Sequence, residues 1–115
     1  MLQQELPMQV TIDFTKIKDS NTFHSAFKER MGFPEFYGNN MDAWIDCMSY
    51  IDDPDAGMSS VTVKSGECLE IVLLGTEVAI KNCPEVSQGF IECTAFVNKR
   101  FMESNTKTRL KIIAT

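Results

Sequence analysis

The sequence predicts an α/β fold in which a single layer of about three parallel β-strands packs with three to four α-helices. Short strand-like apolar segments alternate along the chain with longer segments of helical periodicity. Strands separated by helices are joined by right-handed crossovers and lie parallel. The length of 115 residues fits one domain, residues 1–115, and 43% hydrophobic residues suffice for a core.

The first strand is predicted over residues 8–14, where apolar and polar side chains alternate. This period places one set of side chains on one face: Met8, Val10, Ile12 and Phe14. Asp19 or Ser20 caps the helix that follows, because short polar side chains accept hydrogen bonds from the free N–H groups of a first turn. Its apolar stripe repeats every fourth residue, at Phe23, Phe27 and Met31. Gly32 ends this helix, and Pro34 keeps the next residues extended.

A second helix is predicted to begin near Asn39 or Asn40 and to run to about Ile51, before a turn-rich stretch. One face of it carries the core candidates Met41, Trp44, Met48 and Ile51, with Asn40 and Cys47 at its flank. The opposite face carries Asp42, Ile45, Asp46 and Ser49.

The second strand is predicted over residues 68–74, a nearly continuous apolar run typical of a strand covered on both faces. A short helix over 77–81 follows, and Pro84 opens a longer helix. The apolar stripe of that helix is Val86, Phe90, Cys93, Val97 and Phe101. Residues 110–114 form the last strand, and residues 60–64 form either an extra edge strand or an ordered loop.

The negative charge is concentrated in one third of the chain. The formal net charge is −5, which argues against nucleic-acid binding and against docking on an anionic membrane, and permits a cationic partner. No basic residue lies between Arg30 and Lys64, and this stretch holds six acids: Glu35, Asp42, Asp46, Asp52, Asp53 and Asp55. The rest of the chain has ten acids and eleven bases, so the whole excess belongs to this stretch.

The sequence also indicates a cytoplasmic protein without metal or cofactor. The N-terminal residues 1–7 have neither a basic nor an apolar signal region, and no apolar run is long enough to span a bilayer. The four cysteines form no Cys-x-x-Cys pair and lie far from the single histidine, so we expect reduced cysteines packed as small hydrophobic side chains.

The acidic face of the second helix permits three interpretations. Two carboxylates four residues apart destabilise an isolated helix by about 0.2–0.5 kcal/mol, and Asp42 in the first turn recovers some of this from the helix dipole. Asp42 and Asp46 either solvate an outer face or, with an exposed Ile45 between them, serve a partner. Paired-carboxylate catalysis is a third interpretation, but no nucleophile or set of metal ligands accompanies them.

One segment resembles a known family. Phe23-His24, and the run Phe33-Pro34-Glu35-Phe36-Tyr37-Gly38-Asn39-Asn40-Met41-Asp42-Ala43-Trp44-Ile45-Asp46-Cys47, are similar to the barstar family, the intracellular inhibitors of barnase-type ribonucleases. The resemblance covers residues 23–47 without a gap. It implies a barstar-like fold, a structural histidine at His24, and a loop and helix that plug a ribonuclease active site with acids in place of RNA phosphates.

The resemblance also implies roles for single residues. Asp46 matches the principal phosphate-mimicking acid and Asp42 its companion. Phe36 matches a tyrosine that packs on a catalytic histidine, and its missing hydroxyl leaves stacking without a hydrogen bond. Ile45 stands where the family commonly has tryptophan, and the nearest match to a further acid on the last helix is Glu103. The implied partner-binding set is Phe36, Gly38, Asn40, Asp42, Ala43, Ile45, Asp46, Ser49 and Glu103.

The leading hypothesis is therefore an immunity protein, monomeric when free, that inhibits a basic ribonuclease. A second hypothesis is an acidic interaction module with the same fold that binds a non-nuclease partner. A small cysteine-dependent enzyme is a third, weakened because the sequence places no base near any cysteine.

Overall fold

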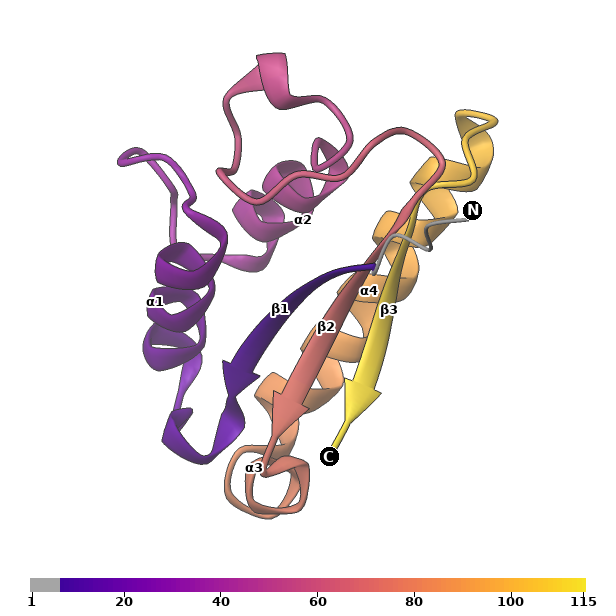
Figure 1. Ribbon diagram of the computed structural model, residues 1–115. Coiled ribbons are helices and arrows are strands. Elements are labelled where there is room, and N and C mark those ends of the chain that lie inside the picture. The colour runs from indigo at the N-terminus through magenta and orange to yellow at the C-terminus, as the bar shows by residue number, and fades with distance from the viewer. Residues whose placement is uncertain (1–6) are drawn as a thin grey trace, which may run out of the picture.

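The computed structural model describes residues 7–115, so the signal prediction for the N-terminus lies almost wholly outside the described residues. Strands and helices alternate in the predicted order (Figure 1). The elements are β1 (Met8–Asp13), α1 (Ser20–Met31), α2 (Met41–Ser49), β2 (Cys68–Leu74), α3 (Thr76–Asn82), α4 (Pro84–Glu103) and β3 (Arg109–Ala114). Two 3-10 turns, Phe14–Lys16 and Pro54–Ala56, complete the described chain.

The three strands form one parallel sheet in the order β1-β2-β3. Met8 of β1 aligns with Leu69 of β2, which aligns with Leu110 of β3. The α/β class and the parallel pairing are thus confirmed. Phe14 is buried as predicted but begins a 3-10 turn, whereas Met8 is 47% exposed at the start of β1.

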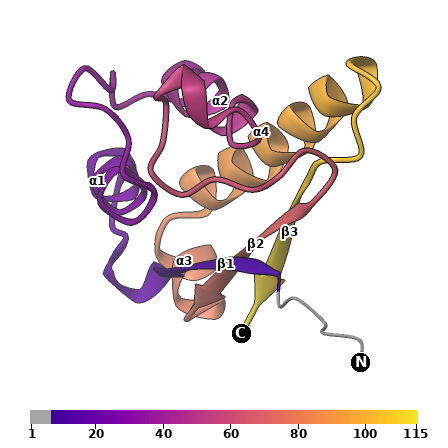
Figure 2. The same ribbon diagram turned by 45° about the horizontal axis from the view of Figure 1, so that its top comes forward.

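The sheet is covered on one face, which corrects the prediction that β2 is covered on both. Leu69, Ile71 and Leu73 are buried, while Glu70 and Val72 between them are only partly buried. Helices α1, α2 and α4 all lie on the same side of the sheet (Figure 2), and α3 lies beyond the carboxyl ends of the strands (Figure 1). Glu70 is the one polar residue of the run and lies on the uncovered face, whereas Cys68, Val72 and Leu74 make the rest of that face apolar in sequence.

Helix α1 begins and ends where the sequence predicts. Asp19 is the N-cap, and it exchanges hydrogen bonds with Thr22 in a capping box: the Thr22 N–H donates to the Asp19 carboxylate at 2.8 Å. These hydrogen bonds hold the pKa of Asp19 below its usual value. Gly32 ends the helix with φ +67°, a left-handed conformation that favours glycine. The predicted stripe of Phe23, Phe27 and Met31 is buried.

Helix α4 contributes one buried face to the core. Phe90, Val97 and Phe101 of its predicted stripe are buried, and Val86 and Cys93 are partly buried. Phe90 contacts rings from three other elements: Phe14, Phe23, Phe27 and Trp44, at centroid distances of 5.5–5.9 Å. This aromatic cluster joins α1, α2 and α4.

The segment between α2 and β2 is an ordered loop rather than an extra strand. The Ser60 N–H donates to the Met31 carbonyl at 2.8 Å, which ties the loop to the C-terminus of α1. Buried Val63 donates to the Ile51 carbonyl at 2.9 Å. The Asp52 carboxylate accepts from the Thr108 hydroxyl at 2.8 Å, so one acid of the acidic stretch is held against the start of β3.

No helix within residues 7–115 is long and apolar enough to cross a membrane. In the same part of the chain, no three side chains of metal-ligating type gather into a metal site.

Candidate functional site

The turn before α2 fixes where that helix begins. Asn39 has φ +53°, a left-handed conformation that asparagine tolerates better than most residues. Asn40 is then extended and caps α2, because its side-chain oxygen accepts from the Ala43 N–H at 2.8 Å. A Cβ atom at Gly38 would lie 3.3 Å from the Asn40 amide nitrogen, so a larger residue there would crowd the cap.

The inner face of α2 is anchored in the core. Trp44, Cys47 and Met48 are buried, as predicted, and Ile51 is buried just beyond the helix, which ends at Ser49 rather than at Ile51. The Trp44 ring makes T-shaped contacts with Phe27 and Phe90 at 5.7 and 5.8 Å. Its buried Nε1 has no hydrogen-bond partner among the described residues.

The outer face of α2 presents carboxylates to solvent. Asp42 and Asp46 are exposed, whereas Ala43, Ile45 and Ser49 are half-buried. The prediction of an exposed Ile45 is wrong, since its side chain packs against the core. Ser49 donates from its hydroxyl to the Ile45 carbonyl at 2.6 Å, which satisfies its polar group within the helix.

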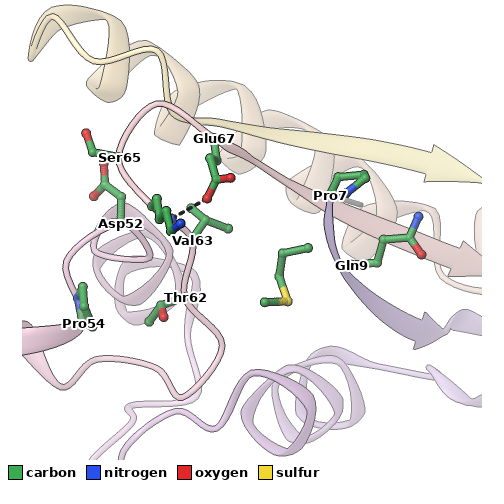
Figure 3. Close-up of a pocket in the computed structure, with 10 residues that line it drawn as sticks. Pro7, Gln9, Asp52, Pro54, Thr62, Val63, Ser65 and Glu67 are labelled. Carbon is green, nitrogen blue, oxygen red and sulfur yellow. Dashed lines mark hydrogen bonds between the residues drawn. The ribbon is translucent and has the colours of Figure 1, made fainter. Parts of the chain in front are cut away.

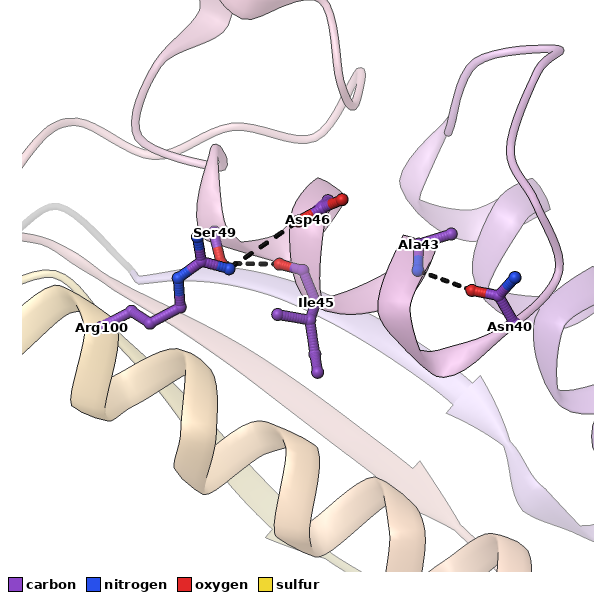
Figure 4. Close-up of polar contacts among 6 residues, drawn as sticks. All are labelled: Asn40, Ala43, Ile45, Asp46, Ser49 and Arg100. Atoms are coloured by element: carbon purple, nitrogen blue, oxygen red, sulfur yellow. Dashed lines mark hydrogen bonds and ion pairs between the residues drawn. The ribbon is translucent and has the colours of Figure 1, made fainter.

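Helix α4 brings a cation to this face that the sequence did not indicate. A guanidinium nitrogen of Arg100 lies 3.8 Å from a carboxylate oxygen of Asp46 (Figure 4). Burial, then the Glu92 carboxylate and then that of Asp42, one turn earlier on α2 than Asp46, raises the pKa of the Cys93 thiol on α4. The two helices therefore run side by side, with Asp42 near Cys93 and Asp46 near Arg100. Arg100 follows Cys93 by seven residues, so helical spacing places them on one side of α4 but does not say which helix that side meets.

The loop before α2 exposes one large aromatic ring. Tyr37 donates its N–H to the Pro34 carbonyl at 2.9 Å, closing a turn that leaves the Phe36 side chain 76% exposed. The buried Tyr37 hydroxyl lies 2.6 Å from Nδ1 of buried His24, which ties this loop to α1. Burial lowers the pKa of His24 and raises that of Tyr37, so both groups are neutral at physiological pH.

The remaining predicted residue, Glu103, lies at the end of α4. Its carboxylate is 4.0 Å from the Lys99 ammonium, and both side chains are exposed. Glu103 follows Arg100 by three residues, so it lies on the neighbouring part of the same helix surface. The structure thus gathers the predicted residues in three places: the loop before α2, α2 itself and the last turn of α4.

The cysteine thiols give little support to nucleophilic chemistry. Burial, followed by the nearby Asp46 carboxylate, raises the pKa of Cys47 to about 11, so this thiol is protonated at neutral pH. Buried Cys83 donates to the Ile17 carbonyl at 3.4 Å. All four cysteines are free, but Cys68 is exposed at the start of β2, which corrects the expectation that all four pack as hydrophobic side chains.

A cavity of about 720 Å³ opens beside the acidic face rather than on it (Figure 3). It lies between the loop of residues 52–67 and the amino ends of β1 and β2. Two of its polar groups have partners: the Lys64 N–H donates to the Glu67 carboxylate at 2.9 Å, and the Asp52 carboxylate accepts from the Thr108 hydroxyl at 2.8 Å. The exposed face of α2 therefore remains the best candidate for a binding site.

Comparison with known proteins identifies a family for most of the chain. The model of the Barstar (barnase inhibitor) family matches residues 8–113, nearly the whole described chain. A curated relative from Bacillus subtilis (strain 168), named "Putative ribonuclease inhibitor YrdF", is 32% identical over 47 residues. That match covers 40% of this chain and 52% of the relative, so it spans about half of the relative's length.

Proposed function

The chain belongs to the barstar family of barnase inhibitors, and from this premise we propose that it inhibits a basic ribonuclease by covering the active site with α2 and the loop before it. Asp42 and Asp46 then take the place of RNA phosphates against the cationic groups of the enzyme. The observation that carries the proposal is a pair of exposed carboxylates on a helix whose opposite face buries Trp44, Cys47 and Met48. A rigid helix presents its charges without an ordering cost at the moment of binding.

The surrounding charges support a cationic partner. No lysine or arginine lies between residues 30 and 64, so the charged residues of α2, of the loop before it and of the first part of the loop after it are all acids. Carboxylates concentrated on one face accelerate encounter with a basic enzyme, and the acceleration falls as salt is added.

Half-buried and exposed apolar groups complete the proposed contact surface. Phe36 offers an exposed ring for stacking on the enzyme, and Ile45 and Ala43 offer apolar surface between the acids. Gly38 and Asn40 shape the turn, Ser49 lies at the end of α2, and Glu103 adds an acid from α4. We infer that the free protein is a monomer and that its free thiols suit a reducing compartment such as the cytoplasm.

The proposal is tested by inhibition of barnase and of other basic ribonucleases with purified protein. Asp46→Asn and Asp42→Asn keep the side-chain shape and remove the charge. Each lost charge-assisted hydrogen bond costs about 1.5–3 kcal/mol, which raises the inhibition constant about 10- to 150-fold. Glu77→Gln is the matched control, since it removes the same charge from α3, at the far end of the molecule from α2 (Figure 1).

Inhibition that survives both aspartate substitutions unchanged would show that α2 does not mimic phosphates. Binding to a protein without ribonuclease activity, together with failure to inhibit any ribonuclease, would favour an interaction module instead.

A further inference from the structure

The acidic face of α2 contains a cation supplied by the protein itself. Within residues 7–115 the structure has two ion pairs, and only one of them joins two helices: Arg100 of α4 to Asp46 of α2. This arginine thus occupies a place beside the carboxylate that is proposed to receive a cationic group of the ribonuclease (Figure 4).

We propose that Arg100 is a specificity-determining residue, a built-in counter-ion of Asp46 that the ribonuclease must displace in order to bind. This inference rests on the proposed function and adds a selective step to it. A partner gains more from Asp46 when its own cation binds the carboxylate better than Arg100 does, so the ion pair disfavours weakly basic partners.

The geometry makes this counter-ion easy to displace. The closest approach of nitrogen to oxygen, 3.8 Å, is too long for a hydrogen bond. The two side chains retain 46% and 63% of their exposure, so water screens the pair. Exposed ion pairs of this kind favour the paired over the unpaired arrangement by about 1.4- to 5-fold.

Arg100 also has other groups to contact once it leaves Asp46. Its guanidinium carbon lies 6.0 Å from the centre of the Phe96 ring, at the outer limit of a cation–π contact. Glu103 lies three residues further along α4, within the usual reach of helical neighbours. The last turn of a helix is also a favourable place for a positive charge.

Retention of Arg100 beside Asp46 would oppose binding. Two like unit charges about 5–7 Å apart at an interface of effective dielectric constant near 20 repel enough to weaken binding on the order of a hundredfold. The cost of breaking the exposed pair is much smaller, so displacement is the favoured route into the complex.

The test compares Arg100→Met with Lys99→Met in binding to barnase or to whichever ribonuclease the unmodified protein inhibits. Both variants remove one positive charge from the same turn of α4, but Lys99 pairs with Glu103 and not with Asp46. We expect Arg100→Met to bind about 3- to 10-fold more tightly and to associate faster, and Arg100→Lys to lie between. Lys99→Met, which frees Glu103 rather than Asp46, should show a smaller effect. When Asp46→Asn is also present, Arg100→Met should no longer bind the ribonuclease more tightly than Lys99→Met does.

Equal binding by the two methionine variants, or weaker binding by Arg100→Met, would overturn the role of Arg100 and leave the proposed function standing. A wild-type protein that inhibits no ribonuclease would overturn both. A measurement without partner completes the test: the side-chain carboxylate ¹³C signal of Asp46 should move in Arg100→Met and stay in place in Lys99→Met. An unmoved signal in both would show that the ion pair does not form in solution.

Discussion

Replacement of Tyr37 by phenylalanine removes one oxygen atom from the pair that ties the loop before α2 to α1. The hydroxyl lies 2.6 Å from Nδ1 of His24, and both residues are buried. The Tyr37 ring would keep its contact with Phe33, whose centroid is 4.7 Å away, so apolar packing is preserved. The histidine nitrogen, however, would lose its partner without gaining water. A buried polar group left unsatisfied costs about 1–3 kcal/mol, and we expect the free energy of unfolding to fall by that amount.

Urea unfolding followed by tryptophan fluorescence measures this loss. Trp44 is the single tryptophan of the chain and is fully buried, so its emission reports the intact core. Tyr50→Phe is the matched control, because that tyrosine is 45% exposed, and an exposed substitution of this kind changes stability by about 0.5 kcal/mol or less. If Tyr37→Phe unfolds at the same urea concentration as Tyr50→Phe, the hydrogen bond to His24 contributes nothing and the reasoning is refuted.

Three further predictions concern stability and thiol reactivity. Burial lowers the pKa of His24 from its usual value of 6.5, so on acidification the unfolded chain binds a proton at His24 before the folded chain does. The urea midpoint of unfolding should therefore fall as the pH drops below about 6.5, and it should fall less steeply in His24→Gln. Gly32→Ala should lower the free energy of unfolding, measured with urea, by about 1–2 kcal/mol or more. The reason is that φ of residue 32 is +67° and the new Cβ would overlap the Ser60 side chain, so a second substitution, Ser60→Gly, should restore part of the lost stability. A thiol reagent under native conditions should modify exposed Cys68 first and Cys47 last, because Cys47 is buried and has a pKa of about 11. Peptide mass spectrometry would show the order of modification, and the reverse order would contradict the burial described above.

The order and type of the elements could be predicted because each depends on local chemistry. Asp19 and Asn40 are short acceptors placed before apolar stripes, and Gly32 follows the last residue of one stripe. The stripe of α1 repeats every fourth residue with the polar residues Ser25 and Glu29 midway, a pattern that gives a helix, but not a strand, one apolar face. These signals are complete within a few residues of each cap, so no knowledge of the rest of the fold is needed.

Contacts between distant elements could not be predicted in the same way. The half-burial of Ile45 and the approach of Arg100 to Asp46 both depend on how α2 lies along α4, a helix that begins 35 residues after α2 ends. The uncovered face of β2 depends on which side of the sheet the helices choose. The candidate site was thus predictable as a set of carboxylates on α2, whereas its internal counter-ion was not.

The length of α2 limits how far the proposed inhibitor can be reduced. Nine residues make two and a half turns, and an isolated helix of that size is mostly unfolded in water. Its shape is maintained by Trp44 against rings of α1 and α4, and its preceding loop by His24 of α1. A synthetic peptide that copies residues 34–50 would carry the same carboxylates without a fixed spacing between them. The binding surface is therefore a property of the assembled fold, and transplanting it would require a scaffold that supplies both neighbouring helices.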